Sequence, residues 1–539
     1  MTSTRRLLIS TAAAVALIAA ASMRTATQTP TRPAPFDLEE ATVAQLQQRM
    51  TSGQETARSL VDKYLARIDA LDRQGPALRA VIEINPEARA IADGLDAERR
   101  SKGPRGPLHG IPVLIKDNIA TADRMMTTAG SHALENARPP KDAFIVARLR
   151  EAGAVILGKT NLSEWANFRS THSSSGWSGR GGQAKNPYAL DRSPSGSSSG
   201  SGAAAAANLC AVAVGSETDG SIVSPSSNES LVGIKPTLGL LSRAGIVPIS
   251  HSQDTAGPMA RSVADAAALL GPMAGTDADD PATHTADAKG LRDYSMFLNP
   301  NGLAGARIGV IRNRLFGYSP AADRLAETAI ADMKQRGAVI VDPANIPTLG
   351  KFDDSEFDVL LYEFKADLNK YLAWLGPAAP VHSLKDVIAY NDAHKDQEMP
   401  YFAQEIMLQA EKRGPLTSAT YLRELAQDHQ MSRALGIDAV MAKYRLDALV
   451  APTGGPAWLT DLVNGDGGTG AAPGPSTVAA VAGYPHITVP AGFANGLPVG
   501  ISFVGRAWSE PTLIKLAYAY EQATKHRRPP TFASTADVR

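Results

Sequence analysis

The stretch of small residues at positions 195–221 constrains this chain more than any other feature. Its sequence is SGSSSGSGAAAAANLCAVAVGSETDGS. Two loops rich in Gly and Ser flank an apolar run over residues 203–214, which must be buried. A flexible linker stays polar and repetitive throughout, so this stretch is not a linker. Small residues in loops anchored by buried segments let backbone N–H groups and hydroxyls approach a reacting atom closely. We therefore expect a functional site at these two loops.

A lysine at the end of another apolar run is a candidate general base. A serine hydroxyl is a poor nucleophile until a base removes its proton, and residues 195–221 contain no histidine. Lys116 ends the run GIPVLIK at 110–116, where a buried strand is predicted. A lysine that loses contact with water becomes neutral and able to accept a proton. A lysine at a strand end can also extend to solvent, so these residues alone leave both interpretations open.

Four motifs together resemble those of the amidase signature family. They are GIPVLIKDN at 110–118, GSSSGS at 196–201, GSETDGSI at 215–222 and GIKPT at 233–237. The resemblance implies a serine amidohydrolase that converts a carboxamide to an acid and ammonia through an acyl-enzyme. It implies that Lys116 is the general base, Ser197 a bridging serine after a cis peptide bond, and Ser221 the nucleophile. It implies no cofactor and no metal ligand.

The resemblance also implies where an oxyanion is stabilised. The backbone N–H groups of Thr218, Asp219, Gly220 and Ser221 match the family's oxyanion hole. Thr171 and Ser173 lie just before the first small-residue loop, so they are candidates for lining the substrate pocket. Asp219 is a third candidate for substrate binding, through the amide nitrogen, unless it only braces its loop.

Departures from the wider family resemble its bacterial peptide amidase branch. Most members have Gly-Gly-Ser at the nucleophile and an Arg after Ser-Ile, whereas this chain has Asp-Gly-Ser at 219–221 and Val223. That branch removes ammonia from C-terminally amidated peptides, so we expect such peptides as substrates, with aryl or aliphatic amides as the alternative.

Asn-Glu-Ser at 228–230 replaces apolar residues and a Gly, and we expect the Glu to weaken packing beneath the nucleophile loop.

Other functions compete with this interpretation. Residues 153–160, GAVILGKT, fit the phosphate-loop pattern of nucleotide-binding proteins, but their apolar centre favours a buried strand. Residues 196–200 fit the G-x-S-x-G elbow of Ser-His-Asp hydrolases, with Ser198 as nucleophile, but a turn-like segment precedes them. A non-catalytic binding protein is a third class. Amidotransferase subunits also resemble the family, and a predicted export signal argues against that role.

Short apolar segments alternating with helical patterns predict an α/β fold. We expect one large domain over residues 37–530, with a mixed, mostly parallel twisted sheet covered by helices on both faces, and a tail at 531–539. A single domain is favoured because one site draws on residues 116, 197 and 221. Residues 350–445 lack strand patterns and are predicted to form a helix-rich insertion. Predicted strands are 81–84, 112–115, 154–157, 211–214, 308–311, 339–341, 448–450, 487–489 and 499–504, and predicted helices are 57–71, 262–270, 322–336 and 511–523.

Charge and cysteine content restrict the partners and the compartment. Lys and Arg number 54, as do Asp and Glu, so no basic excess indicates a nucleic-acid partner. Cys210 is the single cysteine, so no internal disulfide forms. An Arg pair at 5–6 before an apolar run predicts a twin-arginine signal peptide over 1–23, then a disordered leader at 24–36. We expect an exported, periplasmic or secreted monomer with no stable membrane association after cleavage, because the run is short for a membrane span.

Overall fold

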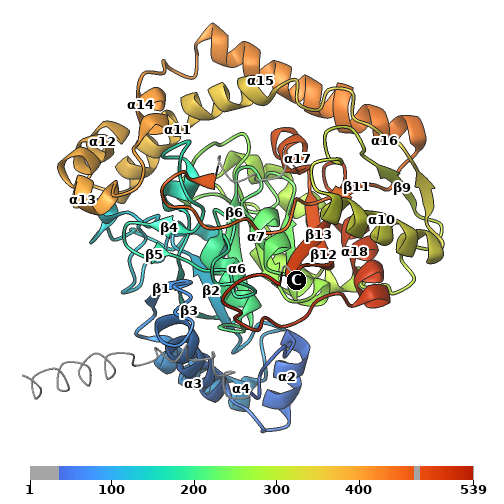
Figure 1. The fold of residues 1–539 in the computed structure, drawn as a ribbon. Coiled ribbons are helices and arrows are strands. Elements are labelled where there is room, and N and C mark those ends of the chain that lie inside the picture. Colours follow the sequence, from blue (N-terminus) through green and yellow to red (C-terminus); the bar gives the residue numbers. More distant parts are fainter. Residues whose placement is uncertain (1–35, 467–473, 538–539) are drawn as a thin grey trace, which may run out of the picture. The chain divides into compact units, whose positions relative to one another are not determined.

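An 11-stranded sheet forms the centre of the fold (Figure 1). The computed structural model describes residues 36–466 and 474–537. The predicted signal peptide and all but the last residue of the predicted leader lie outside these ranges, so export remains a prediction. In spatial order the strands are β1 (Val81–Ile84), β3 (Val155–Thr160), β2 (Pro112–Lys116), β6 (Val212–Glu217), β8 (Thr255–Ala260), β7 (Val232–Lys235), β12 (His486–Ala494), β13 (Leu497–Val504), β11 (Ala448–Pro452), β9 (Arg307–Val310) and β10 (Val339–Val341).

The predicted mixed sheet is confirmed, with parallel pairing confined to two groups of strands. β2 pairs in parallel with β3 and β6, and β9 pairs in parallel with β10 and β11. The other neighbours in the sheet are antiparallel, so parallel pairs are a smaller share than expected. The difference arises because β12 and β13 form a hairpin and because the sequence patterns did not predict β7 and β8. A separate small hairpin joins β4 (Trp177–Ser178) and β5 (Gly182–Gln183).

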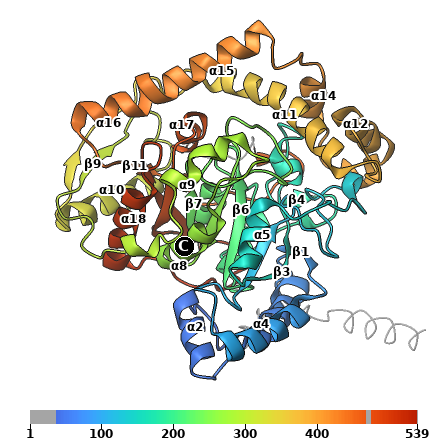
Figure 2. The same cartoon turned by 180° about the vertical axis from the view of Figure 1, so that it is seen from behind.

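Helices cover both faces of the sheet. α6 (Ser199–Ala206) and α7 (Val223–Asn228) lie in front of it in Figure 1, and α5 (Phe144–Glu151) and α8 (Val263–Met273) lie in front of it in Figure 2. α10 (Pro320–Gln335) and α18 (Glu510–Thr524) pack on β12 and β13. The other α-helices outside the insertion, among the described residues, are α2 (Val43–Thr51), α3 (Ala57–Ile68), α4 (Ala88–Lys102), α9 (Ala286–Lys289) and α17 (Ser476–Ala482). No helix of the described ranges is both long and apolar enough to span a bilayer.

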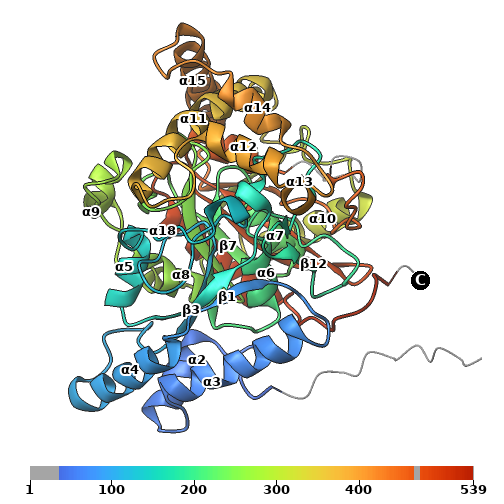
Figure 3. The ribbon, with the colours of Figure 1, turned by 90° about the vertical axis from the view of Figure 1, so that its left-hand side faces the viewer.

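The predicted helix-rich insertion is present and contains no strand over residues 350–445. It lies at the opposite end of the sheet from α2–α4 (Figure 3). Buried side chains of its first helix pack with residues 165 and 168 of the body, and the Phe168 and Phe364 ring centroids are 5.1 Å apart. Its helices are α11 (Asp353–Leu375), α12 (Leu384–Ala393), α13 (Lys395–Glu398), α14 (Glu405–Glu411), α15 (Ala419–Ser432) and α16 (Asp438–Tyr444).

The first small-residue loop is shorter than expected, because α6 begins at Ser199 within the Gly/Ser run. Glycine is a poor helix former, so packing must explain its presence there. A Cβ placed on Gly200 would lie 2.3 Å from the Ala80 oxygen and 2.5 Å from the Asn161 oxygen. The small residues of α6 therefore allow the helix to contact neighbouring backbone, which a larger side chain would prevent.

The predicted tail is attached to the body over its described residues. The Phe532 N–H donates to the Pro187 oxygen at 3.0 Å, and the Asp537 N–H donates to the Asn495 oxygen at 3.0 Å. Phe532 is also buried. Residues 531–537 thus belong to the packed structure rather than extending from it.

Glu229 is a fully buried acid without a partner. Neither of its carboxylate oxygens has a hydrogen-bond donor within the described residues, and the side chain has no exposed surface. The carboxyl lies against α6, since a Cβ on Gly202 would come within 1.7 Å of Glu229 Oε2. Burial raises the pKa of Glu229 well above its ordinary value, so the group is held in its neutral form.

Replacing Glu229 with leucine should stabilise the protein, because a buried polar group without partners costs on the order of 1–3 kcal/mol. The raised pKa fixes the pH dependence. Below the ordinary value of 4.5 the proton is bound in both the folded and the unfolded chain, and stability falls as pH rises toward the folded-state pKa. The gain in melting temperature from Glu229→Leu should therefore be larger at pH 7.5 than at pH 4.5, measured by calorimetry.

Glu229→Gln is the matched control, since it keeps the shape of the side chain but cannot ionise. Its melting temperature should lose the part of the pH dependence that Glu229 contributes. A Glu229→Leu protein that melts at or below the wild-type temperature at pH 7.5 would show that the buried acid is not a stability defect.

Candidate active site

Lys116 ends β2 with its amine buried among serine oxygens. The side chain has no exposed surface. Its Nζ lies 2.7 Å from Ser197 Oγ, 3.0 Å from Ser216 Oγ and 3.2 Å from the Ser216 carbonyl oxygen. β2 lies between β3 and β6, so the apolar run before Lys116 is covered on both sides by neighbouring strands. The predicted burial of this lysine is confirmed, and extension to solvent is excluded.

Burial lowers the pKa of Lys116 to about 7, against the attraction of the Asp254 and Glu217 carboxylates. A neutral lysine amine has two N–H donors and one lone pair. The two Ser216 oxygens can accept both N–H bonds, which leaves the lone pair to face the Ser197 hydroxyl. This arrangement suits an amine that takes a proton from Ser197.

Ser197 contacts the lysine, and its neighbour Ser198 contacts the second loop. The Gly196–Ser197 peptide bond is cis, as the family resemblance implies. The Ser163 N–H donates to the Ser197 carbonyl oxygen at 3.1 Å, and the Ser198 N–H donates to the Ser221 carbonyl oxygen at 3.1 Å. The second of these bonds ties the two small-residue loops together. Ser197 and Ser221 are therefore held on adjoining backbone.

The loop at residues 218–221 presents free donors next to the Ser221 hydroxyl. Gly220 has φ +76°, the left-handed region that favours glycine. Within the described residues none of the backbone N–H groups of 218–221 has an acceptor, and no hydrogen bond engages the Ser221 hydroxyl. Glu217 instead takes the next two N–H groups, of Ile222 at 2.7 Å and Val223 at 3.0 Å, at the start of α7. A developing negative oxygen near Ser221 would find unoccupied donors here.

The substrate-binding candidates occupy different settings. Thr171 is exposed, and its hydroxyl donates to Glu405 of α14 at 2.9 Å. The Ser173 hydroxyl donates to Asn167 Oδ1 at 2.7 Å. Both hydroxyls thus face neighbouring loop and insertion residues. Asp219 adjoins the Ser221 loop, where the Thr477 hydroxyl donates to its Oδ2 at 2.7 Å, and its Oδ1 is buried without a hydrogen-bond partner among the described residues.

Two residues next to the lysine were not singled out from the sequence. Ser216 supplies both oxygens that accept from Lys116, and Asn118 donates to Ser216 Oγ at 2.9 Å. Asn118 follows Lys116 by two positions in the motif at 110–118, and Ser216 precedes the second loop. Their positions within the quoted motifs were the available signal. Their roles depend on contacts between segments far apart in the chain.

The residues of the competing functions are engaged elsewhere. Ser198 has no exposed surface, and its hydroxyl donates to the Ser216 carbonyl at 3.0 Å, so it is not presented as an elbow nucleophile. Lys159, the lysine of the phosphate-loop pattern, is buried in β3, and its Nζ donates to the Ile119 oxygen at 2.6 Å and to Thr127 Oγ1 at 2.8 Å. The pattern at 153–160 forms a strand rather than a loop that cradles phosphate.

A family model described as Amidase matches residues 59–514. The chain belongs to the amidase family. A probable amidase of Arabidopsis thaliana is 43% identical over 92% of each chain, and a glutamyl-tRNA(Gln) amidotransferase subunit of Halorhodospira halophila is 35% identical over 92% of this chain and 99% of its own. The solved structure of native peptide amidase from Stenotrophomonas maltophilia is 53% identical, with a TM-score of 0.88, over 92% of this chain and all of that one.

These similarities place the chain among enzymes that hydrolyse amides. They also confirm the predicted fold, because the peptide amidase has the same single α/β domain. The roles of the buried lysine and the serine loops must therefore be sought in amide hydrolysis.

Proposed function

We propose that this amidase removes ammonia from the C-terminal carboxamides of peptides, with Lys116 as base, Ser197 as bridge and Ser221 as nucleophile. One observation carries the proposal. The buried Lys116 amine contacts the Ser197 hydroxyl at 2.7 Å, beside a loop whose backbone N–H groups have no acceptor in the described ranges. Acyl transfer from an amide requires both a base for the nucleophile and donors for the oxyanion, and this arrangement offers both.

The first half-reaction transfers the acyl group to Ser221. Ser221 Oγ attacks the carboxamide carbon as its proton passes to Ser197 and the Ser197 proton passes to Lys116. The carbonyl oxygen becomes negative and is stabilised by N–H groups of residues 218–221. The carbon–nitrogen bond then breaks as Lys116, through Ser197, returns a proton to the leaving nitrogen, which departs as ammonia.

The second half-reaction restores the enzyme by hydrolysis. Water attacks the acyl carbon and gives its proton to the same Ser197–Lys116 relay. The bond to Ser221 Oγ breaks, Ser221 regains a proton, and the carboxylic acid leaves. The lysine exchanges a proton with Ser197 in each step, while its other two hydrogens stay with the Ser216 oxygens. Little side-chain rearrangement is therefore required.

Similarity to a peptide amidase supports the substrate class, at 53% identity over the full length of that structure. Asp219 offers a further reason for a primary amide. Its Oδ1 is buried without a hydrogen-bond partner in the described part of the chain, two residues before Ser221, where it can accept a hydrogen bond from a carboxamide NH₂. Aryl or aliphatic amides are the alternative substrates.

Lys116→Ala should lower kcat/KM by about a thousandfold or more with the fold intact, because Ser197 then has no base.

In the wild type, kcat/KM should rise about tenfold per pH unit below the Lys116 pKa of about 7 and level off above it, since the neutral amine is the active form. Ammonia release from a peptide amide at each pH measures both effects.

Ser198→Ala is the matched control, because that serine lies next to Ser197 while its hydroxyl bonds the Ser216 backbone within the described residues. It should retain activity within about tenfold of the wild type, whereas Ser221→Ala should be inactive. Loss of activity at Ser198 alone would favour the elbow mechanism. Near-normal activity of Lys116→Ala would contradict the proposed triad.

A substrate panel tests the peptide specificity. Ammonia release should be fastest from peptides ending in a carboxamide, absent from the same peptides with a free carboxylate, and slower by about tenfold or more from acetamide and benzamide. The expected difference comes from binding of the peptide chain beyond the reacting amide. Hydrolysis of acetamide or benzamide without any hydrolysis of peptide amides would contradict the proposed substrate class.

A further inference from the structure

Helix α11 of the insertion holds a turn at residues 250–254, which leads into β8. Glu363 of α11 has no exposed surface. Its Oε2 accepts from Ser250 Oγ at 2.5 Å, from the Ser252 N–H at 3.0 Å and from Ser252 Oγ at 2.9 Å. Its Oε1 accepts from the Tyr421 hydroxyl of α15 at 2.7 Å. A single carboxylate thus fixes several donors of the turn.

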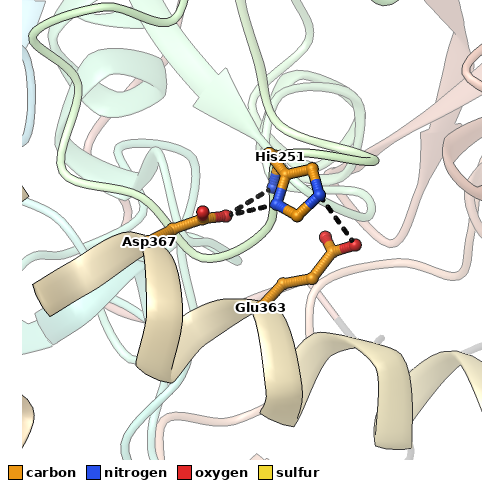
Figure 4. Close-up of side chains that lie close together, drawn as sticks. All are labelled: His251, Glu363 and Asp367. Atoms are coloured by element: carbon orange, nitrogen blue, oxygen red, sulfur yellow. Dashed lines mark hydrogen bonds and ion pairs between the residues drawn. The ribbon is translucent and has the colours of Figure 1, made fainter. Parts of the chain in front are cut away.

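Two further acids on the same face of α11 hold the turn. Asp367 Oδ2 accepts from the His251 N–H at 2.9 Å and lies 2.8 Å from His251 Nδ1, while His251 Nε2 lies 3.4 Å from Glu363 Oε1 (Figure 4). Glu356 accepts from Gln253 Nε2 at 2.9 Å. Three carboxylates from one helix therefore position residues 250–253.

The turn also holds Thr218, the first residue of the loop at 218–221, which we call the oxyanion loop. Gln253 Nε2 donates to the Thr218 carbonyl oxygen at 3.3 Å. The Thr218 hydroxyl donates to Asp254 Oδ1 at 2.6 Å, and Asp254 Oδ2 accepts the N–H groups of Ile249 and Ser250 at 2.8 and 2.9 Å. Both the carbonyl and the hydroxyl of Thr218 are thereby fixed. Its N–H has no acceptor among the residues that the structure describes, so it is available to an oxyanion.

The ring of His251 is suited to bridge the two carboxylates. Burial lowers its pKa, but the hydrogen bond to Asp367 and the charges of Glu363 and Asp367 outweigh both burial and the nearby Arg243, so the net pKa is raised. When protonated, the ring can donate from both nitrogens. Tyr421 from α15 also faces the ring, with its hydroxyl 3.4 Å from Nε2.

A metal site is a poor interpretation of the same cluster. Ligand atoms of His251, Glu363 and Asp367 lie within 4.8 Å of one another. The two ring nitrogens, however, face different carboxylates, and one imidazole cannot direct both nitrogens to a single ion. Both oxygens of Glu363 already accept hydrogen bonds from the turn and from Tyr421. The contacts fit an attachment between segments better than a coordination shell.

We propose that α11 positions the oxyanion loop, with Glu363 as the principal positioning residue acting through the turn at 250–254. The inference rests on the proposed function, because it assigns the N–H groups of 218–221 to the oxyanion. Helix α11 then contributes to transition-state stabilisation through the turn at 250–254. The acids of α11 determine how accurately the Thr218 N–H is positioned toward the negative charge that develops on the carbonyl oxygen.

The test compares two inhibitors on the full-length enzyme. A peptide aldehyde adds to Ser221 and places its oxygen in the oxyanion hole, whereas the matching peptide alcohol binds without forming that oxygen. In the wild type, both oxygens of Glu363 accept hydrogen bonds from the turn and from Tyr421. Glu363→Gln leaves a single acceptor oxygen for these donors. It should weaken aldehyde inhibition about tenfold or more and lower kcat by a similar factor, with KM and alcohol inhibition within about twofold.

Asp354→Asn is the matched control, since this acid is exposed on the same helix away from the turn. It should match the wild type in every constant. Ser252→Ala is a milder second variant for the case in which Glu363→Gln fails to fold. It should change the ratio of the aldehyde inhibition constant to the alcohol inhibition constant about threefold in the same direction. An unchanged ratio and kcat in a folded Glu363→Gln or Ser252→Ala protein would overturn the inference.

The same experiment separates this inference from the proposed triad. If Glu363→Gln behaves as the wild type while Lys116→Ala is inactive, only the positioning role fails. If the aldehyde adduct forms on a residue other than Ser221, the proposed triad fails as well. A rise in melting temperature with added Zn²⁺ that is lost in His251→Gln would contradict the attachment and favour a metal site.

Discussion

The proposed chemistry depends on the burial of the Lys116 amine against Ser197 and Ser216. A charged amine without water or a carboxylate contact is unfavourable, so burial shifts the pKa toward neutrality. Within residues 36–466 and 474–537, serine oxygens alone surround Nζ within hydrogen-bonding distance. A contacting carboxylate would restore the charge and remove the base. The sheet secures this environment, because Lys116 closes a strand that is covered on both sides.

Close packing of small residues brings the serines to this amine. A Cβ on Gly196 would lie 2.3 Å from Ser163 Oγ, and one on Gly215 would lie 2.7 Å from Ser198 Oγ. These glycines provide space rather than flexibility. Support also comes from the insertion, since α11 contacts the turn that holds Thr218. The catalytic groups lie on short loops, and their positions depend on the strands and helices around them.

Local patterns predicted the strands with continuous apolar runs and, through the family resemblance, the residues that meet at the site. They failed where packing overrides propensity. β8 contains Gly257 and Pro258, which disfavour a strand, and α6 forms in a Gly/Ser run. The placement of Thr171 was also beyond local patterns, because its partner Glu405 comes from a distant helix. Contacts such as Thr218 with Asp254 arise only once the chain has folded.

Direct titration of the Lys116 side chain tests the central claim. NMR of the enzyme with isotopically labelled lysine reports the charge of each amine, and comparison with Lys116→Met identifies the Lys116 signal among the buried lysines. The Lys116 signal should change from that of a charged amine to that of a neutral one near pH 7. A Lys116 amine that stays charged to pH 10 would contradict it.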